Sequence, residues 1–104
     1  MDETTSDKVF LLKHFVLETQ SEGNIAEMDK LGYRPATHAE AYEFQKKQPD
    51  LQLKVWIIAL GSFAVRGGFR YVTVLDSDSG RRIFGDDWFD FGWLSSRRFL
   101  FVRK

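Results

Sequence analysis

The stretch GYRPATHAE, residues 32 to 40, joins a glycine, an aromatic side chain, an arginine and a proline to the start of a helix. Thr37 and Glu40 have the spacing of a capping box, in which the threonine hydroxyl accepts a backbone N–H and the carboxylate bonds back to the N-cap. We expect the helix to continue to about Lys47, whose charge suits the negative end of the helix dipole, and to end before Pro49.

The residues before this stretch predict one strand and one short helix. VFLLKHFVL, residues 9 to 17, is rich in Val, Phe and Leu and favours a strand, although its length leaves a helix open. Asn24 and Glu27 repeat the capping pattern, so we expect a helix from there to Gly32, which would end it in a left-handed conformation. Residues 1 to 7 are polar and predict a disordered tail.

After Pro49 the pattern becomes that of strands. LKVWIIAL, residues 53 to 60, is a continuous apolar run that predicts a buried central strand ending at Gly61. Gly67 and Gly68 predict a two-residue hairpin turn, and DSDSG, residues 76 to 80, predicts another. RRIF and the closing RRFLFVRK predict two further strands. The sequence therefore predicts a single α+β domain over residues 8 to 104, with two helices packed on a mostly antiparallel sheet of about five strands.

Several chemistries are excluded or disfavoured by the residues themselves. The 104-residue chain has no cysteine, which excludes disulfides, thiolate catalysis and cysteine-bound zinc or iron–sulfur sites. Asp76, Asp78 and Asp87 have the spacing of calcium ligands, but Arg81 stands where an EF-hand loop needs glycine. The two histidines belong to no evident cluster. We therefore predict no catalytic residues, no metal site and no cofactor.

The distribution of apolar residues disfavours a membrane protein. No run approaches the roughly 20 apolar residues of a membrane-spanning helix. The polar start MDETTSDK lacks the basic residues and apolar run of a secretory signal. We therefore expect a cytoplasmic protein with no membrane partner.

The most unusual segment is GDDWFDFGWLSSRR, residues 85 to 98, which crowds four aromatic side chains among polar ones. Packing of these rings in the core is the simplest interpretation. On an extended strand, however, Trp88 would point to the opposite face from Phe89 and Trp93, so at least one ring is expected at the surface. An exposed ring beside polar side chains would form a binding site for a protein or a carbohydrate. The residues predicted to bind this ligand are Trp88, Asp90, Trp93, Ser95, Ser96 and Arg97.

Nucleic-acid binding is the alternative that the charge distribution leaves open. The net charge is zero, but residues 1 to 50 carry 6 basic against 10 acidic side chains, and residues 51 to 104 carry 9 against 5. An arginine-rich sheet face could contact phosphates while aromatic rings stack on bases, although the same asymmetry also suits an ordinary solvated surface. The glycine pair at residues 67 and 68 interrupts the strand that an RNA-recognition motif would need. The residues of this alternative site are Arg66, Phe69, Arg70, Tyr71, Arg81, Arg82 and Arg98.

Three short motifs resemble those of a known group of proteins. GYRPATHAE is similar to the G-Y-R-L-P-T-x-x-E-W-E signature of formylglycine-generating sulfatase-modifying enzymes and of bacterial and phage domains with a C-type-lectin-like fold. RGGF, residues 66 to 69, is similar to the R-G-G-S-W of that family, and RRFLFVRK resembles its final strand. The residues that carry the first similarity are Gly32, Tyr33, Arg34, Thr37, Glu40 and Glu43.

The resemblance implies a compact C-type-lectin-like sheet with an aromatic, ligand-contacting loop before the last strand. Pro35 and Ala36 replace the Leu-Pro of the signature, and Ala41 stands in place of its tryptophan. The catalytic cysteines of the formylglycine-generating enzymes are absent, so their activity does not transfer. We therefore expect a non-enzymatic binding module that acts through protein–protein or carbohydrate contacts.

Overall fold

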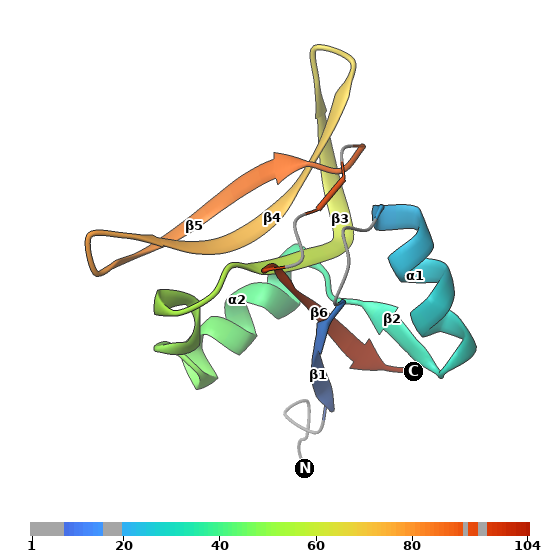
Figure 1. The fold of residues 1–104 in the computed structure, drawn as a ribbon, viewed down its shortest axis with the longest axis horizontal. Coiled ribbons are helices and arrows are strands. Elements are labelled where there is room, and N and C mark those ends of the chain that lie inside the picture. The colour runs from blue at the N-terminus through green and yellow to red at the C-terminus, as the bar shows by residue number, and fades with distance from the viewer. Residues whose placement is uncertain (1–7, 16–19, 91, 94–95) are drawn as a thin grey trace.

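The computed structural model describes residues 8–15, 20–90, 92–93 and 96–104, and it confirms an α+β fold. Two helices pack against a mostly antiparallel sheet of six strands, one more than expected (Figure 1). The tail predicted at residues 1 to 7 lies outside the described residues. The elements are β1 (Phe10–His14), α1 (Ser21–Lys30), β2 (Tyr33–Pro35), α2 (His38–Lys47), the 3-10 turn η2 (Leu51–Leu53), β3 (Ile57–Arg66), β4 (Phe69–Asp78), β5 (Arg81–Trp88) and β6 (Arg98–Arg103).

The strands follow the order β1-β6-β3-β4-β5, and β2 also pairs with β6. All neighbouring pairs are antiparallel except β3 and β6, which run parallel over a short overlap at Ile57 and Ile58. The β3–β4 and β4–β5 hairpins extend well beyond the helices, toward the top and the left of Figure 1. This leaves much of both hairpins outside the two-helix part of the fold.

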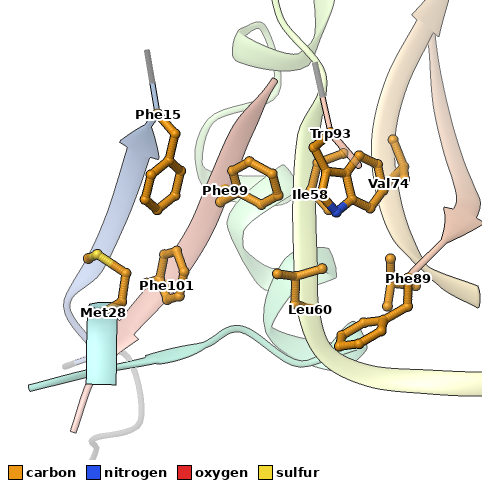
Figure 2. Packing of buried hydrophobic residues seen from close by; sticks show 10 residues of the cluster. Phe15, Met28, Ile58, Leu60, Val74, Phe89, Trp93, Phe99 and Phe101 are labelled. Carbon is orange, nitrogen blue, oxygen red and sulfur yellow. The ribbon is translucent and has the colours of Figure 1, made fainter. Parts of the chain in front are cut away.

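The sheet forms the middle layer between two apolar clusters. Side chains alternate along β6, so Phe99 and Phe101 join the cluster on the α1 side while Leu100 and Val102 join the cluster on the α2 side. Figure 2 shows the first cluster, in which Met28 of α1 packs with Phe15, which directly follows β1, and with aromatic and aliphatic side chains of β3 and β6. Both faces of the sheet are therefore covered where the helices lie.

The capping box predicted at the start of α2 is confirmed. The backbone N–H of Glu40 donates to the hydroxyl of Thr37 at 3.2 Å, and the backbone N–H of Thr37 donates to Glu40 Oε1 at 3.0 Å. Lys46 and Lys47 occupy the last turn, and the helix ends before Pro49 as expected.

The predicted start of α1 is wrong. The helix begins at Ser21, and Asn24 is a buried residue inside it instead of its N-cap. A tertiary contact overrides the local capping pattern: the hydroxyl of Ser21, the first residue of α1, donates a hydrogen bond to the carbonyl oxygen of Phe89 at 2.7 Å. Gly32 follows the helix with φ of 87°, the left-handed conformation that its position predicted.

The strand predicted for residues 53 to 60 starts later and continues further than expected. Residues Leu51–Leu53 form the turn η2, and β3 runs through Gly61 to Arg66 with a register shift between Ala59 and Phe63. The pairing of β3 with β6 ends at Ile58, and further along β3 the backbone N–H of Gly61 donates to the carbonyl oxygen of Ala36 at 2.7 Å. Gly61 is therefore a crossing point of two chain segments and does not end the strand.

The short strand β2 pairs with β6 beyond the point where the pairing of β3 with β6 ends. Tyr33, Arg34 and Pro35 pair with the second half of β6, and the N–H of Ala36 donates to Leu100 O at 3.0 Å. The sequence did not predict this strand, because three residues that include a proline show no alternation.

Both predicted hairpin turns are confirmed. Gly67 and Gly68 have φ of 59° and 84°, and Ser79 and Gly80 have φ of 51° and 80°, as two-residue turns between twisted antiparallel strands require. The strand predicted at RRIF extends to Trp88, so the polar residues before the tryptophan belong to β5. Within the described ranges, neither helix is long and apolar enough to cross a membrane.

Candidate ligand-binding site

Trp93 is a core residue and not an exposed anchor. Its side chain is 4% exposed, and its ring packs edge-on against Phe99 at 5.8 Å between centroids (Figure 2). The indole Nε1–H donates to the Ser21 hydroxyl at 2.7 Å, and that hydroxyl donates to Phe89 O. Ser21 thus ties the segment after β5 to the start of α1, and Trp93 presents no face for a ligand.

We expect Ser21→Ala to lower the free energy of unfolding by about 2 kcal/mol. The substitution leaves the buried indole N–H of Trp93 and the carbonyl oxygen of Phe89 without their shared partner, and such groups cost about 1–3 kcal/mol. Urea denaturation measures the loss. Ser96→Ala is the matched control, because Ser96 is exposed and its loss should change stability by less than about 0.5 kcal/mol. Equal stability of the two variants would contradict this account of Ser21.

Trp88, in contrast, lies at the surface at the end of β5. Its side chain is 37% exposed and stacks on the ring of Phe69, with centroids 5.3 Å apart and planes 17° from parallel. Tyr71 meets the same indole edge-on at 6.4 Å. Trp88 and Tyr71 are opposite each other in the β4–β5 register and therefore share one face of the sheet. We call Phe69, Tyr71 and Trp88 the aromatic surface.

A cleft of about 390 Å³ opens beside the aromatic surface and shares Tyr71 with it. Its floor is made by β3, β4 and β5, and one wall is the start of α2. The lining residues are His38, Ser62, Phe63, Ala64, Tyr71, Val72, Thr73, Phe84, Gly85 and Asp86.

Hydrogen bonds fix the polar groups of this cleft. His38 Nδ1 lies 2.8 Å from the hydroxyl of Thr73, and the backbone N–H of His38 donates to the Ser62 hydroxyl at 3.1 Å. The ring of Phe84 meets the imidazole edge-on at 4.8 Å. The cleft therefore combines mainly apolar walls with a few oriented polar groups, which is the usual composition of small-ligand sites.

The other predicted ligand contacts have partners elsewhere. Asp90 forms an ion pair with Arg70, and this hydrogen bond holds the pKa of the Asp90 carboxyl below its ordinary value. The Arg97 guanidinium lies over the half-buried ring of Trp56 at 3.9 Å and donates to the Ser96 hydroxyl at 3.1 Å. Ser95 lies outside the described residues. Only Trp88 of the predicted set belongs to the aromatic surface.

Most arginines of the alternative nucleic-acid site are paired with acidic side chains. Arg66 binds Asp86 at 2.5 Å, Arg70 binds Asp90, and Arg82 binds Asp50 at 2.7 Å. Arg66 also lies over the Tyr71 ring at 4.0 Å, and Arg98 donates to the carbonyl oxygen of Ser96. Arg81 is exposed.

These positions also do not share one side of the sheet. Arg70 and Tyr71 are adjacent on β4 and so point to opposite faces. The predicted residues therefore do not form one continuous positive face.

Sequence reasoning missed the cleft and assigned His38 to no cluster of functional residues. The usable signal was the pairing of Tyr71 and Thr73 with the even-numbered residues of β5, which the two-residue turn at residues 79 and 80 fixes. Nothing in the sequence indicated that the start of α2 would close the cleft.

Comparison with models of known protein families, with curated proteins and with solved structures finds no match to this chain. Among the residues that the structure describes, no three His, Cys, Asp or Glu side chains are grouped in a way that could hold a metal ion.

Proposed function

We propose that this chain is a non-enzymatic binding domain whose ligand rests on the aromatic surface and extends into the adjoining cleft. The observation that carries the proposal is the exposed, stacked pair of Trp88 and Phe69, which are 37% and 44% exposed. Large aromatic rings gathered at a surface favour binding, because a partner that covers them removes apolar area from water. Tyr71 joins this pair to the cleft, so one ligand can contact both.

The chemistry of the site favours a ligand with an apolar face and polar edges. The aromatic surface offers ring faces and edges, while the cleft offers the imidazole of His38 and the hydroxyl of Thr73. The ion pair of Arg66 and Asp86 stands beside Tyr71 and supplies charged donors and acceptors. A sugar ring fits this arrangement, since its C–H face can cover an aromatic ring while its hydroxyl groups bond to planar charged groups. We therefore propose a carbohydrate as the ligand and expect this function in the cytoplasm.

The test is a titration of the isotope-labelled protein with a panel of neutral and acidic oligosaccharides, followed by NMR. A binding saccharide should shift the indole resonance of Trp88 and the amides of Tyr71 and Thr73. Trp88→Ala should weaken binding at least tenfold, yet lower the free energy of unfolding by less than the roughly 3–5 kcal/mol that truncation of a fully buried tryptophan costs.

Val65→Ala is the matched control, on the neighbouring β3–β4 hairpin. Val65 is 63% exposed, and strand alternation places it on the other face from Ala64, which lines the cleft. It should therefore leave binding unchanged. Saccharide binding that survives Trp88→Ala, or shifts confined to the face of Val65, would contradict the proposed site. Binding of peptides but of no saccharide would overturn the choice of ligand.

Nucleic-acid binding is the alternative function, supported by the exposed Arg81 and by the Arg66–Tyr71 stack. The dependence of affinity on salt concentration distinguishes it from carbohydrate binding. Binding that follows phosphates weakens by orders of magnitude between about 50 and 200 mM salt, whereas binding to an aromatic surface should change little.

We also propose, as a separate point, that the fold is related to C-type-lectin-like domains. The support for this is the similarity of residues 32 to 40 to the signature of those domains. Two of the residues that carry it, Arg34 and Glu40, form a bidentate ion pair at 2.7 and 2.8 Å between β2 and α2. An experimental structure whose connections match that fold would support the relationship, and different connections would refute it.

A further inference from the structure

Strand β5 is an edge of the sheet, and within the described residues its one strand partner is β4. An edge strand leaves every second residue with its backbone N–H and C=O pointing outward. The N–H of Phe89 donates to Arg70 O at 2.9 Å, which identifies the hydrogen-bonded pairs of the β4–β5 ladder. Because such pairs alternate, the backbone groups of Arg82, Phe84 and Asp86 point away from β4.

The charges of β5 are arranged so that the strand complements itself. Arg81 and Arg82 begin the strand, and Asp86 and Asp87 lie near its end. When two copies pair antiparallel about Phe84, each Arg81 faces Asp87 of the second copy, and each Arg82 faces Asp86 of the second copy. Opposite charges directly across a strand pair are stabilising, and like charges are destabilising.

Backbone geometry favours the same register. For hydrogen bonds to form between the copies, outward-pointing residues of one copy must lie opposite outward-pointing residues of the other. This condition allows the two-fold axis to pass beside Ile83, Phe84 or Gly85, but not between two neighbouring residues. Pairing about Ile83 places Arg82 opposite Phe84, and pairing about Gly85 places Asp86 opposite Phe84. Only pairing about Phe84 matches both arginines with aspartates. It also places Ile83, which is 37% exposed, opposite Gly85 of the second copy, where no side chain competes for the space.

We propose that two copies of this chain associate through β5 to form one continuous antiparallel sheet centred on Phe84. The two-fold axis is then perpendicular to the sheet, so equivalent side chains of the two copies lie on the same face. Both aromatic surfaces and both clefts would face the same way. If the proposed function holds, the dimer binds two ligand units at once and gains avidity, but the pairing itself does not depend on that function.

Arg81 and Asp87 are the residues that test the pairing. Arg82 and Asp86 already bind Asp50 and Arg66 within the chain. Arg81 and Asp87, in the part of the chain that the structure describes, form no ion pair, and the Asp87 carboxylate only accepts the backbone N–H of Trp88. Their charges therefore remain available to a second copy.

The experiment is analytical ultracentrifugation from about 10 µM to 1 mM protein, a range that covers weak association through a small interface. The expected result is a rise in mass from 12.1 kDa toward twice that value. Arg81→Glu places like charges opposite each other and should weaken the dimer at least tenfold. The double variant Arg81→Glu/Asp87→Lys restores opposite charges and should recover most of the affinity. Arg103→Glu, with the same charge change at an exposed site on β6, should behave as the wild type.

Hydrogen exchange supplies a second readout. The amide of Phe84 points outward and should exchange more slowly as the protein concentration rises, while the amide of Ile83 already pairs with β4 and should not change. A mass of 12.1 kDa at every concentration would overturn the proposal. So would a dimer that Arg81→Glu leaves unaffected, or one in which the exchange of Phe84 is independent of concentration.

Discussion

Gly61→Ala is expected to lower the free energy of unfolding by about 3 kcal/mol or more, at the upper end of the range for overpacked sites. A Cβ at Gly61 would lie 2.5 Å from the carbonyl oxygens of both Pro35 and Ala36. These atoms are backbone and cannot rotate away. Ala36 is fully buried, and its N–H and C=O bond to Leu100 and to Gly61 itself. Relief of the clash would therefore separate β3 from the segment between β2 and α2.

Chemical denaturation of Gly61→Ala measures this effect, and Gly23→Ala is its control. A Cβ at Gly23 would meet no atom within 4 Å, and the residue lies inside α1. Alanine there should stabilise the helix by up to about 1 kcal/mol, since glycine is the poorer helix former. The same substitution thus has opposite expected signs at the two sites. A Gly61→Ala protein as stable as the wild type would refute the close crossing of β3 and the β2–α2 segment.

Glu40→Gln is expected to cost about 3 kcal/mol at neutral pH. The Arg34 guanidinium is the main cause that lowers the pKa of the Glu40 carboxyl from 4.5 to about 2, and the backbone N–H of Thr37 and the Lys8 ammonium add to it. Burial of the carboxylate works in the opposite direction. The difference between the two pKa values, at about 1.4 kcal/mol per pH unit, corresponds to about 3 kcal/mol. Glutamine keeps an acceptor for Thr37 but leaves Arg34 without its anion.

The pH dependence of the stability difference between the wild type and Glu40→Gln tests the direction of this pKa shift separately. A carboxyl whose pKa is lower in the folded state stabilises the protein fully above its unfolded pKa, and that stabilisation is lost as the pH falls through the folded value. The gap between the wild type and Glu40→Gln should therefore be constant above about pH 5 and close between pH 4.5 and about 2.

Urea titrations at several pH values measure the gap, with Glu43→Gln as the control. Glu43 is one helical turn further on, and its 31% exposed side chain pairs with the exposed Lys8 and Lys47, so its loss should cost less than about 1 kcal/mol. A gap between the wild type and Glu40→Gln that stays constant down to pH 2 would show that Arg34 does not stabilise the ionised carboxyl.

Local chemistry predicted the parts of the fold that local contacts determine. The capping box at Thr37, the left-handed Gly32 and both two-residue turns follow from the residue types at those positions. The start of α1 was mispredicted because the hydrogen bonds of Ser21 to a distant strand segment override a capping pattern. The sequence predicts a strand end at Gly61, which is wrong, because residue types alone do not show that another backbone segment passes within contact distance.

Of the candidate site, the sequence predicts only which side chains point to the same face of a strand. Alternation predicted Trp88 on the opposite face from Phe89 and Trp93, and Trp88 is exposed while the other two are buried. Because β5 ends at Trp88, however, the burial of Trp93 follows from its hydrogen bond to Ser21 and its packing on Phe99 and not from strand alternation. It could not show that Phe69 and Tyr71, far from Trp88 in the sequence, would adjoin it, because that depends on the β4–β5 register. The cleft also requires α2 to lie beside β4, which follows from packing and not from any motif.

The proposed site requires Trp88 at the surface and Trp93 in the core, and acrylamide quenching of tryptophan fluorescence measures the exposure of each ring. The two proteins to compare each retain one tryptophan, Trp88 or Trp93, with Phe at the other two of the three positions and with folding verified by circular dichroism. The structure predicts red-shifted, readily quenched emission from Trp88 and blue-shifted, shielded emission from Trp93. Shielded emission from both, or ready quenching of Trp93 in a folded protein, would contradict it.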